Sequence, residues 1–299
     1  MPKIKSIARY ATTYSRASVY DDSVIEKKNP LSFLGMDDRG NVTEDKTFDG
    51  EGNVENFIKR KFTGDTLLEE SFFDGFEDQA YETRLFAYDE NEILCSSKIK
   101  YTEDEIEQRY IYSKVGKLIQ KTVVYSDGTS YVENEYEWEG DNLIKAAEYD
   151  EGDPVFVKEM TYNEQGQIIE LSTEEFINKD YQTEAYAYAG DKLIKQTTFN
   201  YRGDVMLTVE NRYEGELLME KTTETGTQFF RHRYTYDEHG RKIRESILNR
   251  DDLVLTDYVT AYDADGLELN TKTYSLNIVD EEKDLILIEQ HTTEYSFHE

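Results

Sequence analysis

Cysteine is almost absent from this chain: Cys95 is the only one in 299 residues. No disulfide can form within such a chain, so we expect a reducing compartment. The N-terminal residues Met1-Pro-Lys-Ile-Lys-Ser-Ile lack the apolar core of a signal peptide, and no apolar run approaches the length of a membrane span. These absences predict a cytoplasmic protein that does not contact a membrane.

The motifs of common catalytic and metal sites are also missing. There is no Gly-x-Ser-x-Gly elbow, no phosphate-binding loop and no dinucleotide fingerprint. Asp49-Gly-Glu-Gly-Asn and Asp263-Ala-Asp-Gly look like parts of calcium loops but lack the full ligand series with its closing glutamate. No zinc spacing links Cys95 to the four histidines, which are His232, His239, His291 and His298. We therefore expect no enzymatic activity, no metal and no cofactor.

Positive charge is scarce. The chain has 34 lysine and arginine residues against 64 acidic residues, for a net charge of −30, although the first 30 residues carry a small excess of basic residues. Contacts with nucleic-acid phosphates or anionic lipids need a basic stripe, so neither partner is expected. Two interpretations stay open. The acids either keep exposed strands soluble and block edge-to-edge association, or they attract a basic partner.

Tryptophan is scarce too, with one residue against 24 tyrosines, and hydrophobic residues make up only 37% of the chain. Tyrosine covers apolar area while its hydroxyl stays in water, so this composition is typical of strands with one partly wet face. The apolar residues show no 3.6-residue period that would indicate an amphipathic helix.

What the sequence does contain is a repeat of about 25 residues between Phe86 and Tyr262. Each unit has an aromatic residue, a polar turn, a strand, a second turn such as Tyr125-Ser-Asp-Gly128, and a second strand. Short turns rich in glycine, aspartate and asparagine join antiparallel strands. The landmark aromatics lie 26, 24, 26, 25, 23 and 26 residues apart and are Tyr112, Trp138, Tyr162, Tyr188, Tyr213, Tyr236 and Tyr262.

The pattern extends back to about residue 36 and predicts an all-β fold. We expect an elongated antiparallel meander of roughly 20 strands, built from two-strand repeats. Because strand twist prevents a sheet of that size from staying flat, we expect one curled, open sheet that forms a partial shell. Residues 36–299 then make a single β-repeat domain, preceded by a partly ordered basic segment at 1–35.

Several aromatic residues come in pairs spaced i, i+2, which places both members on one face of a strand. Repeated along the array, the pairs would form a stripe that either replaces a conventional core or offers a platform for a partner. The partner-binding residues predicted on this basis are Tyr110, Tyr112, Tyr136, Trp138, Tyr186, Tyr188, Tyr234 and Tyr236.

One unit, Tyr234-Thr-Tyr236-Asp237-Glu-His-Gly240-Arg241-Lys-Ile243, resembles the YD repeat of RHS-repeat proteins, with Lys242 as one extra residue. MORN-like antitoxin repeats are similar in style. The RHS resemblance implies a long antiparallel ribbon that spirals into a shell around a toxic C-terminal domain. Here the pattern continues almost to Phe297-His-Glu, so we expect no toxin domain and carry over no toxin activity.

These observations favour a non-enzymatic binding or scaffold protein whose partner is a basic protein. The resemblance implies an immunity, adaptor or chaperone-like role in bacterial conflict. Two alternatives remain: an acidic mimic of nucleic acid that blocks a nucleic-acid-binding protein, and a carbohydrate-binding protein whose tyrosines stack on sugars.

Overall fold

The computed structural model describes residues 3–18, 21–75, 77–279 and 282–298. The regular elements of these residues are 22 strands, which confirms the predicted all-β class. Within the same residues no helix has the length and apolar character needed to cross a membrane. The strands are β1 (Ile4–Ser18), β2 (Asp21–Met36), β3 (Val42–Phe48), β4 (Val54–Thr63), β5 (Thr66–Asp74), β6 (Glu82–Tyr88), β7 (Leu94–Tyr101), β8 (Glu105–Tyr112), β9 (Leu118–Tyr125), β10 (Ser130–Glu139), β11 (Asn142–Asp150), β12 (Asp153–Tyr162), β13 (Ile168–Glu175), β14 (Asp180–Ala189), β15 (Lys192–Phe199), β16 (Val205–Glu214), β17 (Leu217–Thr225), β18 (Phe229–Tyr236), β19 (Lys242–Leu248), β20 (Val254–Tyr262), β21 (Glu268–Val279) and β22 (Glu282–Phe297).

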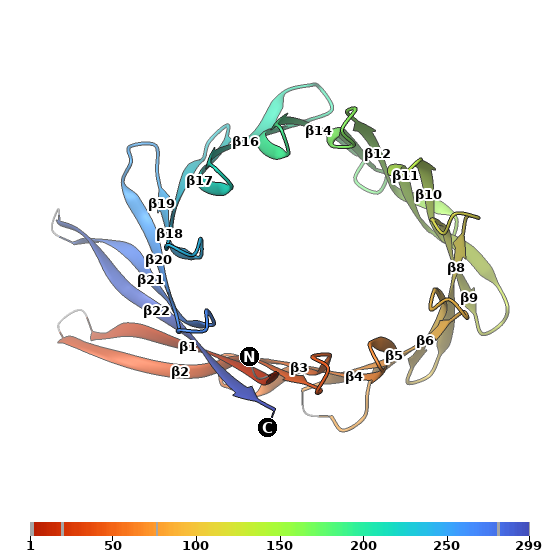
Figure 1. Ribbon diagram of the computed structural model, residues 1–299, viewed down its shortest axis with the longest axis horizontal. Coiled ribbons are helices and arrows are strands. Elements are labelled where there is room, and N and C mark those ends of the chain that lie inside the picture. The colour runs from red at the N-terminus through yellow and green to blue at the C-terminus, as the bar shows by residue number, and fades with distance from the viewer. Residues whose placement is uncertain (1–2, 19–20, 76, 280–281, 299) are drawn as a thin grey trace. The chain divides into compact units, whose positions relative to one another are not determined.

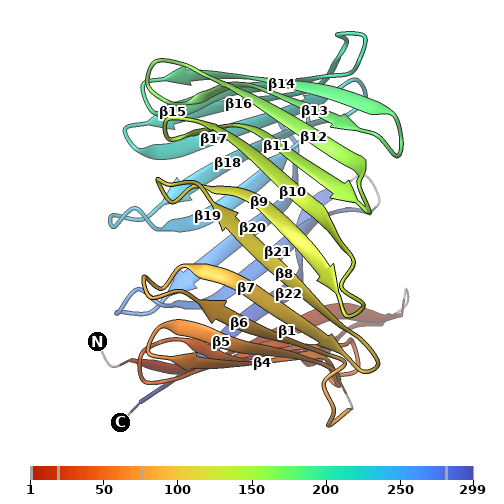
Figure 2. The ribbon, with the colours of Figure 1, turned by 90° about the vertical axis from the view of Figure 1, so that its right-hand side faces the viewer.

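The chain forms two compact units. Unit 1 comprises Met1–Glu82, Tyr213–Glu220 and Phe230–Glu299, and unit 2 comprises Thr83–Arg212 and Lys221–Phe229. In unit 2, each strand from β7 to β16 pairs antiparallel with the next, as Figure 2 shows for β8 to β13. In unit 1, β1 to β5 and β18 to β22 follow the same rule. Consecutive pairing follows directly from the short turns.

One turn geometry recurs along the chain and is seen in the unit that carries the YD motif. The carboxylate of Asp237 accepts hydrogen bonds from the backbone N–H groups of His239 and Arg241, each at 2.9 Å. Gly240, whose φ is 75°, donates its N–H to the carbonyl of Asp237 at 3.0 Å. Asp49 and Asp263 hold the same kind of turn, so the two calcium-like sequences serve turn formation here.

The expectation of an open sheet is wrong. The strands nearest the two termini, β1 and β22, pair antiparallel from Ile4↔Phe297 to Thr13↔Glu289, and both lie beside the marked chain ends in Figure 1. An open meander would leave both as edges. The correction comes from residues 4–36, which form the long strands β1 and β2 although they lack the turn motif that marks the repeats.

Burial is shallow. The buried apolar side chains among the described residues are small or medium-sized and comprise Ala11, Ile99, Val123, Ala147 and Leu248. Buried polar residues are as numerous, and Asp257 is only 4% exposed. Its carboxylate accepts hydrogen bonds from Arg244 Nε at 2.9 Å to both oxygens and from Ser246 Oγ at 2.7 Å. Cross-strand polar contacts thus provide part of the stabilisation that a hydrophobic core provides in other folds.

Candidate protein-binding surface

The landmark aromatics act as clamps between neighbouring strands. Trp138, near the end of β10, donates its indole N–H to the carbonyl of Leu118 at the start of β9, at 2.8 Å. In the same way Tyr188 donates its hydroxyl to the carbonyl of Ile168 at 2.9 Å. Further aromatic clamps join Tyr112 to Leu94, Tyr162 to Leu143, Tyr236 to Leu218 and Tyr262 to Lys242, all between 2.7 and 3.0 Å.

Each clamp hydrogen bond lies just beyond the end of a backbone ladder. The register of β9 with β10 stops at Gln120↔Glu135, two residues before Leu118. The ladders of β7–β8, β11–β12, β13–β14 and β19–β20 stop at the same offset from their clamped carbonyls. In β16 the side-chain amide of Asn211 donates to the carbonyl of Leu193 at 3.0 Å. The 25-residue period is therefore the spacing of a hydrogen bond that satisfies strand ends.

A β-bulge accompanies every such aromatic. Glu137 pairs with Lys145 and Trp138 with Leu143, so Ile144 is the extra residue in β11. A bulge interrupts the alternation of side chains in the strand that carries the extra residue, which is β11 here. Tyr136 and Trp138 of β10 therefore still share a face and alternate with the exposed Glu135, Glu137 and Glu139. Equivalent shifts precede Tyr112, Tyr162, Tyr188, Tyr236 and Tyr262.

The extra residue of the bulge is aliphatic each time. In unit 2 it is Ile119, Ile144, Ile169 or Ile194, and three of these, Ile119, Ile169 and Ile194, are each 37% exposed. We call these four residues the bulge stripe. This stripe was missed in the sequence analysis, although a Leu-Ile or Ile-Ile step directly after each turn marks it. Exposed aliphatic residues repeated in register are typical of contact surfaces.

The first member of each predicted aromatic pair is half-buried. The Tyr186 hydroxyl donates to the carboxylate of Glu184, which also accepts from Gln196 Nε2 at 2.7 Å, and burial raises the pKa of Tyr186. Burial likewise raises the pKa of Tyr234 to about 12. Burial also raises the pKa of Tyr136. The Tyr110 hydroxyl lies 3.3 Å from both Ser97 Oγ and Gln108 Oε1.

Of the predicted pairs, Tyr186 and Tyr188 lie together in a groove of unit 2. The groove has a volume of about 870 Å³ and runs between the turn at 163–167 and the turn at 190–191. Gln167 Nε2 bridges the two turns by donating to the carbonyl of Gly190 at 2.9 Å. The lining residues are Asn163, Gln165, Gln167, Ile169, Tyr186, Ala187, Tyr188, Gly190 and Asp191. One residue of the bulge stripe thus meets two predicted binding residues in a concave site.

The strands around this groove carry a local excess of acid. Residues 130–191 contain 17 aspartates and glutamates against three lysines. The cross-strand registers Glu137↔Lys145↔Glu159 and Glu135↔Ala147↔Val157↔Glu174 place these side chains on one face, to which Glu170 also belongs. We call Glu135, Glu137, Glu159, Glu170 and Glu174, all exposed, the acidic face. Lys145 is the lysine beside them, 3.8 Å from Glu137.

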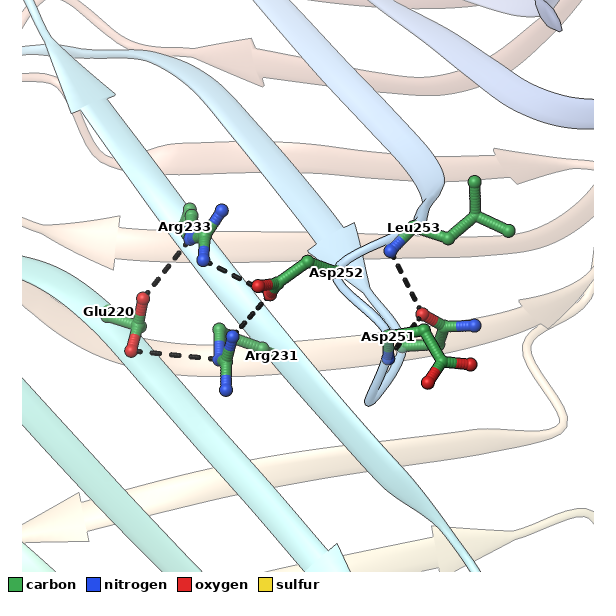
Figure 3. Close-up of polar contacts among 7 residues, drawn as sticks. Glu220, Arg231, Arg233, Asp251, Asp252 and Leu253 are labelled. Carbon is green, nitrogen blue, oxygen red and sulfur yellow. Dashed lines mark hydrogen bonds and ion pairs between the residues drawn. The ribbon is translucent and has the colours of Figure 1, made fainter. Parts of the chain in front are cut away.

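Elsewhere, basic side chains are neutralised within the sheet. In unit 1, Arg231 and Arg233 of β18 both contact Glu220 and Asp252 (Figure 3). Arg233 lies 3.2 Å from each of these carboxylates. Two positive and two negative charges therefore balance at this point. The acidic face of unit 2 has no comparable supply of basic side chains among its described residues.

Comparison with known proteins gives distant structural likenesses. No family model and no curated protein matches the chain. The crystal structure of TcdB2-TccC3-Cdc42 matches with a TM-score of 0.42 and 14% identity over 83% of this chain and 15% of that chain. TcdB2-TccC3 matches with a TM-score of 0.43 and 13% identity over 86% and 16% of the two chains. A porin-like protein from Bacteroides uniformis ATCC 8492 matches with a TM-score of 0.37 and 8% identity over 98% of both. This chain spans about a sixth of the length of the first two.

Proposed function

We propose that this chain is a non-enzymatic binding protein that engages a basic protein through unit 2. The contact surface combines the acidic face, the bulge stripe and the groove at Tyr186 and Tyr188. The observation that carries the proposal is the ratio of 17 acids to three lysines in residues 130–191, the stretch that also holds the groove with its exposed Ile169 and half-buried Tyr186 and Tyr188.

The two kinds of side chain have different tasks in this proposal. Like charges gathered on one face attract an oppositely charged protein at long range and raise its association rate. Apolar and aromatic side chains then supply most of the binding free energy, because they exclude water at the centre of the contact. The clamp formed by Tyr188 and Ile168 fixes one wall of the groove before the partner arrives, which limits the entropic cost of binding.

We also propose a biological setting for this binding protein. A role as an immunity, adaptor or chaperone-like protein rests on the YD-like unit at Tyr234–Ile243 alone. Each of these roles requires a protein partner and no catalysis, which agrees with the binding surface described above.

The test is to capture the partner from a native lysate and to measure its association by surface plasmon resonance. Between about 50 and 500 mM salt the Debye length falls from ~14 to ~4 Å, and the association rate should fall at least roughly tenfold. Replacing the five glutamates of the acidic face by glutamine should have a similar effect at low salt.

A matched control removes the same charge elsewhere. Five exposed acids outside the acidic face are Asp38, Glu51, Glu77, Glu90 and Asp265, and their amide variant should keep most of the association rate. A rate that does not respond to salt, or that falls equally in both variants, would contradict the proposal and leave the charge as a device for solubility.

A further inference from the structure

Two hairpins of unit 1 extend past the rest of their sheet. β1 pairs with β2 as far as Ser18↔Asp21, but its pairing with β22 stops at Thr13↔Glu289. β21 and β22 continue to pair with each other as far as Val279↔Glu282. Figure 1 shows the two hairpins side by side near the chain ends and then separating. Beyond Thr13, each is a two-stranded ribbon.

The outer neighbours of both ribbons also stop early. The register of β3 with β2 reaches Ser32↔Thr47 and goes no further toward the tip. Beyond that pair the turn after β3 contacts β2 through two side chains, since Lys27 Nζ and Asn29 Nδ2 donate to the Gly50 carbonyl at 2.8 and 3.0 Å. Within the described residues, Val24–Lys28 of β2 and Asp284–Ile288 of β22 have a paired strand on one side alone.

Both edges expose apolar side chains. Val24 is 59% and Ile25 is 52% exposed, and Ile286 and Ile288 are exposed within the run Leu285-Ile286-Leu287-Ile288. An open edge with such a sequence is a template for pairing with another strand. An isolated two-stranded ribbon is also only marginally stable, so an added strand would stabilise it.

The two edges complement each other at three of five positions. Set antiparallel, Val24–Lys28 and Asp284–Ile288 place Lys28 opposite Asp284, Ile25 opposite Leu287 and Val24 opposite Ile288. The two other pairs are Glu26 with Ile286 and Lys27 with Leu285. Pairing Asp284–Glu289 with its own copy would instead place Asp284 opposite Glu289, which is unfavourable. Lys28 Nζ lies 3.2 Å from Glu294 Oε1 and 4.1 Å from the ring centroid of Tyr10. Because its ion pair with Glu294 is half-exposed, Lys28 would exchange these contacts for Asp284 at little cost.

Within one molecule these edges do not face each other, since β1 lies between β2 and β22. We propose that the edge of β22 in one copy of this chain pairs antiparallel with the edge of β2 in a second copy. A two-fold axis would then form both contacts at once and give a closed dimer. This surface lies in unit 1 and is independent of the binding surface proposed for unit 2.

Sedimentation velocity of the full chain tests the proposal over about a hundredfold range of concentration. A reversible monomer–dimer equilibrium is expected. Because each copy carries a charge of −30, salt should strengthen the dimer by screening repulsion. This salt response has the opposite sign to the one expected for a basic partner, so the two proposals can fail separately.

Four substitutions locate the contact. Val24→Lys with Ile25→Lys, or Ile286→Lys with Ile288→Lys, should raise the dimer dissociation constant at least roughly tenfold, although both variants lower the net repulsion. The control Val205→Lys with Met206→Lys changes two equally exposed residues of unit 2 and should leave the dimer intact. Hydrogen exchange gives a second readout, with amides of residues 284–288 exchanging more slowly as concentration rises.

Charge exchange tests the register. Lys28→Asp and Asp284→Lys should each weaken the dimer, and the double variant should restore it. A chain that stays monomeric at every concentration and salt would overturn the proposal. A dimer that survives both lysine pairs, or that the control weakens equally, would do the same, because the contact would then lie elsewhere.

Discussion

The indole N–H of Trp138 donates a hydrogen bond to the backbone carbonyl of Leu118, at 2.8 Å, two residues beyond the last pair of the β9–β10 ladder. On its other side Leu118 pairs with Tyr112, which clamps Leu94 in turn. From Leu94 to Leu193 successive hairpins of unit 2 are thus tied by a continuous series of side-chain and backbone contacts, and the repeat of the sequence is the repeat of this series.

Removing one clamp hydroxyl should destabilise the fold. In Tyr162→Phe the ring remains, but the carbonyl of Leu143 loses a hydrogen bond of 2.7 Å. A partly buried acceptor left without its partner costs about 1–3 kcal/mol, measured as the free energy of unfolding in urea. Tyr181→Phe, at an exposed tyrosine, is the control and should cost less than about 0.5 kcal/mol. Equal effects would show that the clamp adds no stability.

Gly240 should resist substitution because of its backbone. Its φ of 75° is unfavourable for residues with a Cβ, although the space around it is open, with Leu217 Cδ2 3.8 Å from an added Cβ. We expect Gly240→Ala to lower the free energy of unfolding by about 1–2 kcal/mol. Gly226→Ala has the same open surroundings without the positive φ. It should be neutral or slightly stabilising, and a loss as large as that of Gly240→Ala would refute the backbone explanation.

The turn aspartates should make stability depend on pH. Backbone hydrogen bonds from Ile93 and Asn91 hold the pKa of Asp89 below its ordinary value of 3.8. A lowered pKa in the folded state stabilises the protein above the ordinary pKa, and this contribution is lost as pH falls through the folded value. We measure the free energy of unfolding of Asp89→Asn and of the native chain from pH 7 to pH 3. The variant should be less stable than the native chain by the largest amount at pH 7, and this difference should shrink toward pH 3. A difference that widens on acidification would contradict this assignment.

The buried carboxylate of Asp257 should be costly to remove. Asp257→Asn leaves Arg244 without its charged partner and weakens the contact with Ser246. Because the Arg244 side chain is half-exposed and can be rehydrated, we expect a loss of about 1–3 kcal/mol, below the cost of breaking a fully buried pair. Thermal and urea unfolding report the loss. Ser246→Ala should cost less, since Arg244 and Asp257 stay paired.

The bulge stripe should govern how long the partner stays bound. Ile119→Ser, Ile169→Ser and Ile194→Ser together should speed dissociation at least tenfold and leave the association rate nearly unchanged, because apolar anchors act after encounter. The control set is Val115→Ser, Ile177→Ser and Val205→Ser, three exposed aliphatic residues of unit 2 outside the stripe. Surface plasmon resonance with the captured partner compares the two sets, and equal dissociation rates would exclude the stripe from the contact.

The sequence predicts strands and turns well where a turn motif is present, because glycine and aspartate at fixed offsets have a direct backbone cause. Residues 4–36 have no such motif, and the pairing of β1 with β22 could not be anticipated from local pattern. The aromatic pairs were visible, but the roles of their members were not. Backbone carbonyls such as that of Leu118 have no signature in the sequence, and a bulge at Ile144 is not implied by alternation.

β1 is synthesised first, and it can pair with β22 only after β2 to β21 have been made. One edge of β1 therefore stays unpaired until a strand almost 300 residues away is complete. The hydroxyls of Ser6 and Ser296, 2.6 Å apart, are separated by 290 positions in the chain. Contacts of such long range are slow to form, and a strand edge that stays unpaired can associate with other chains or with non-native strands. A nascent chain that pauses before β22 would therefore be the species most in need of a chaperone.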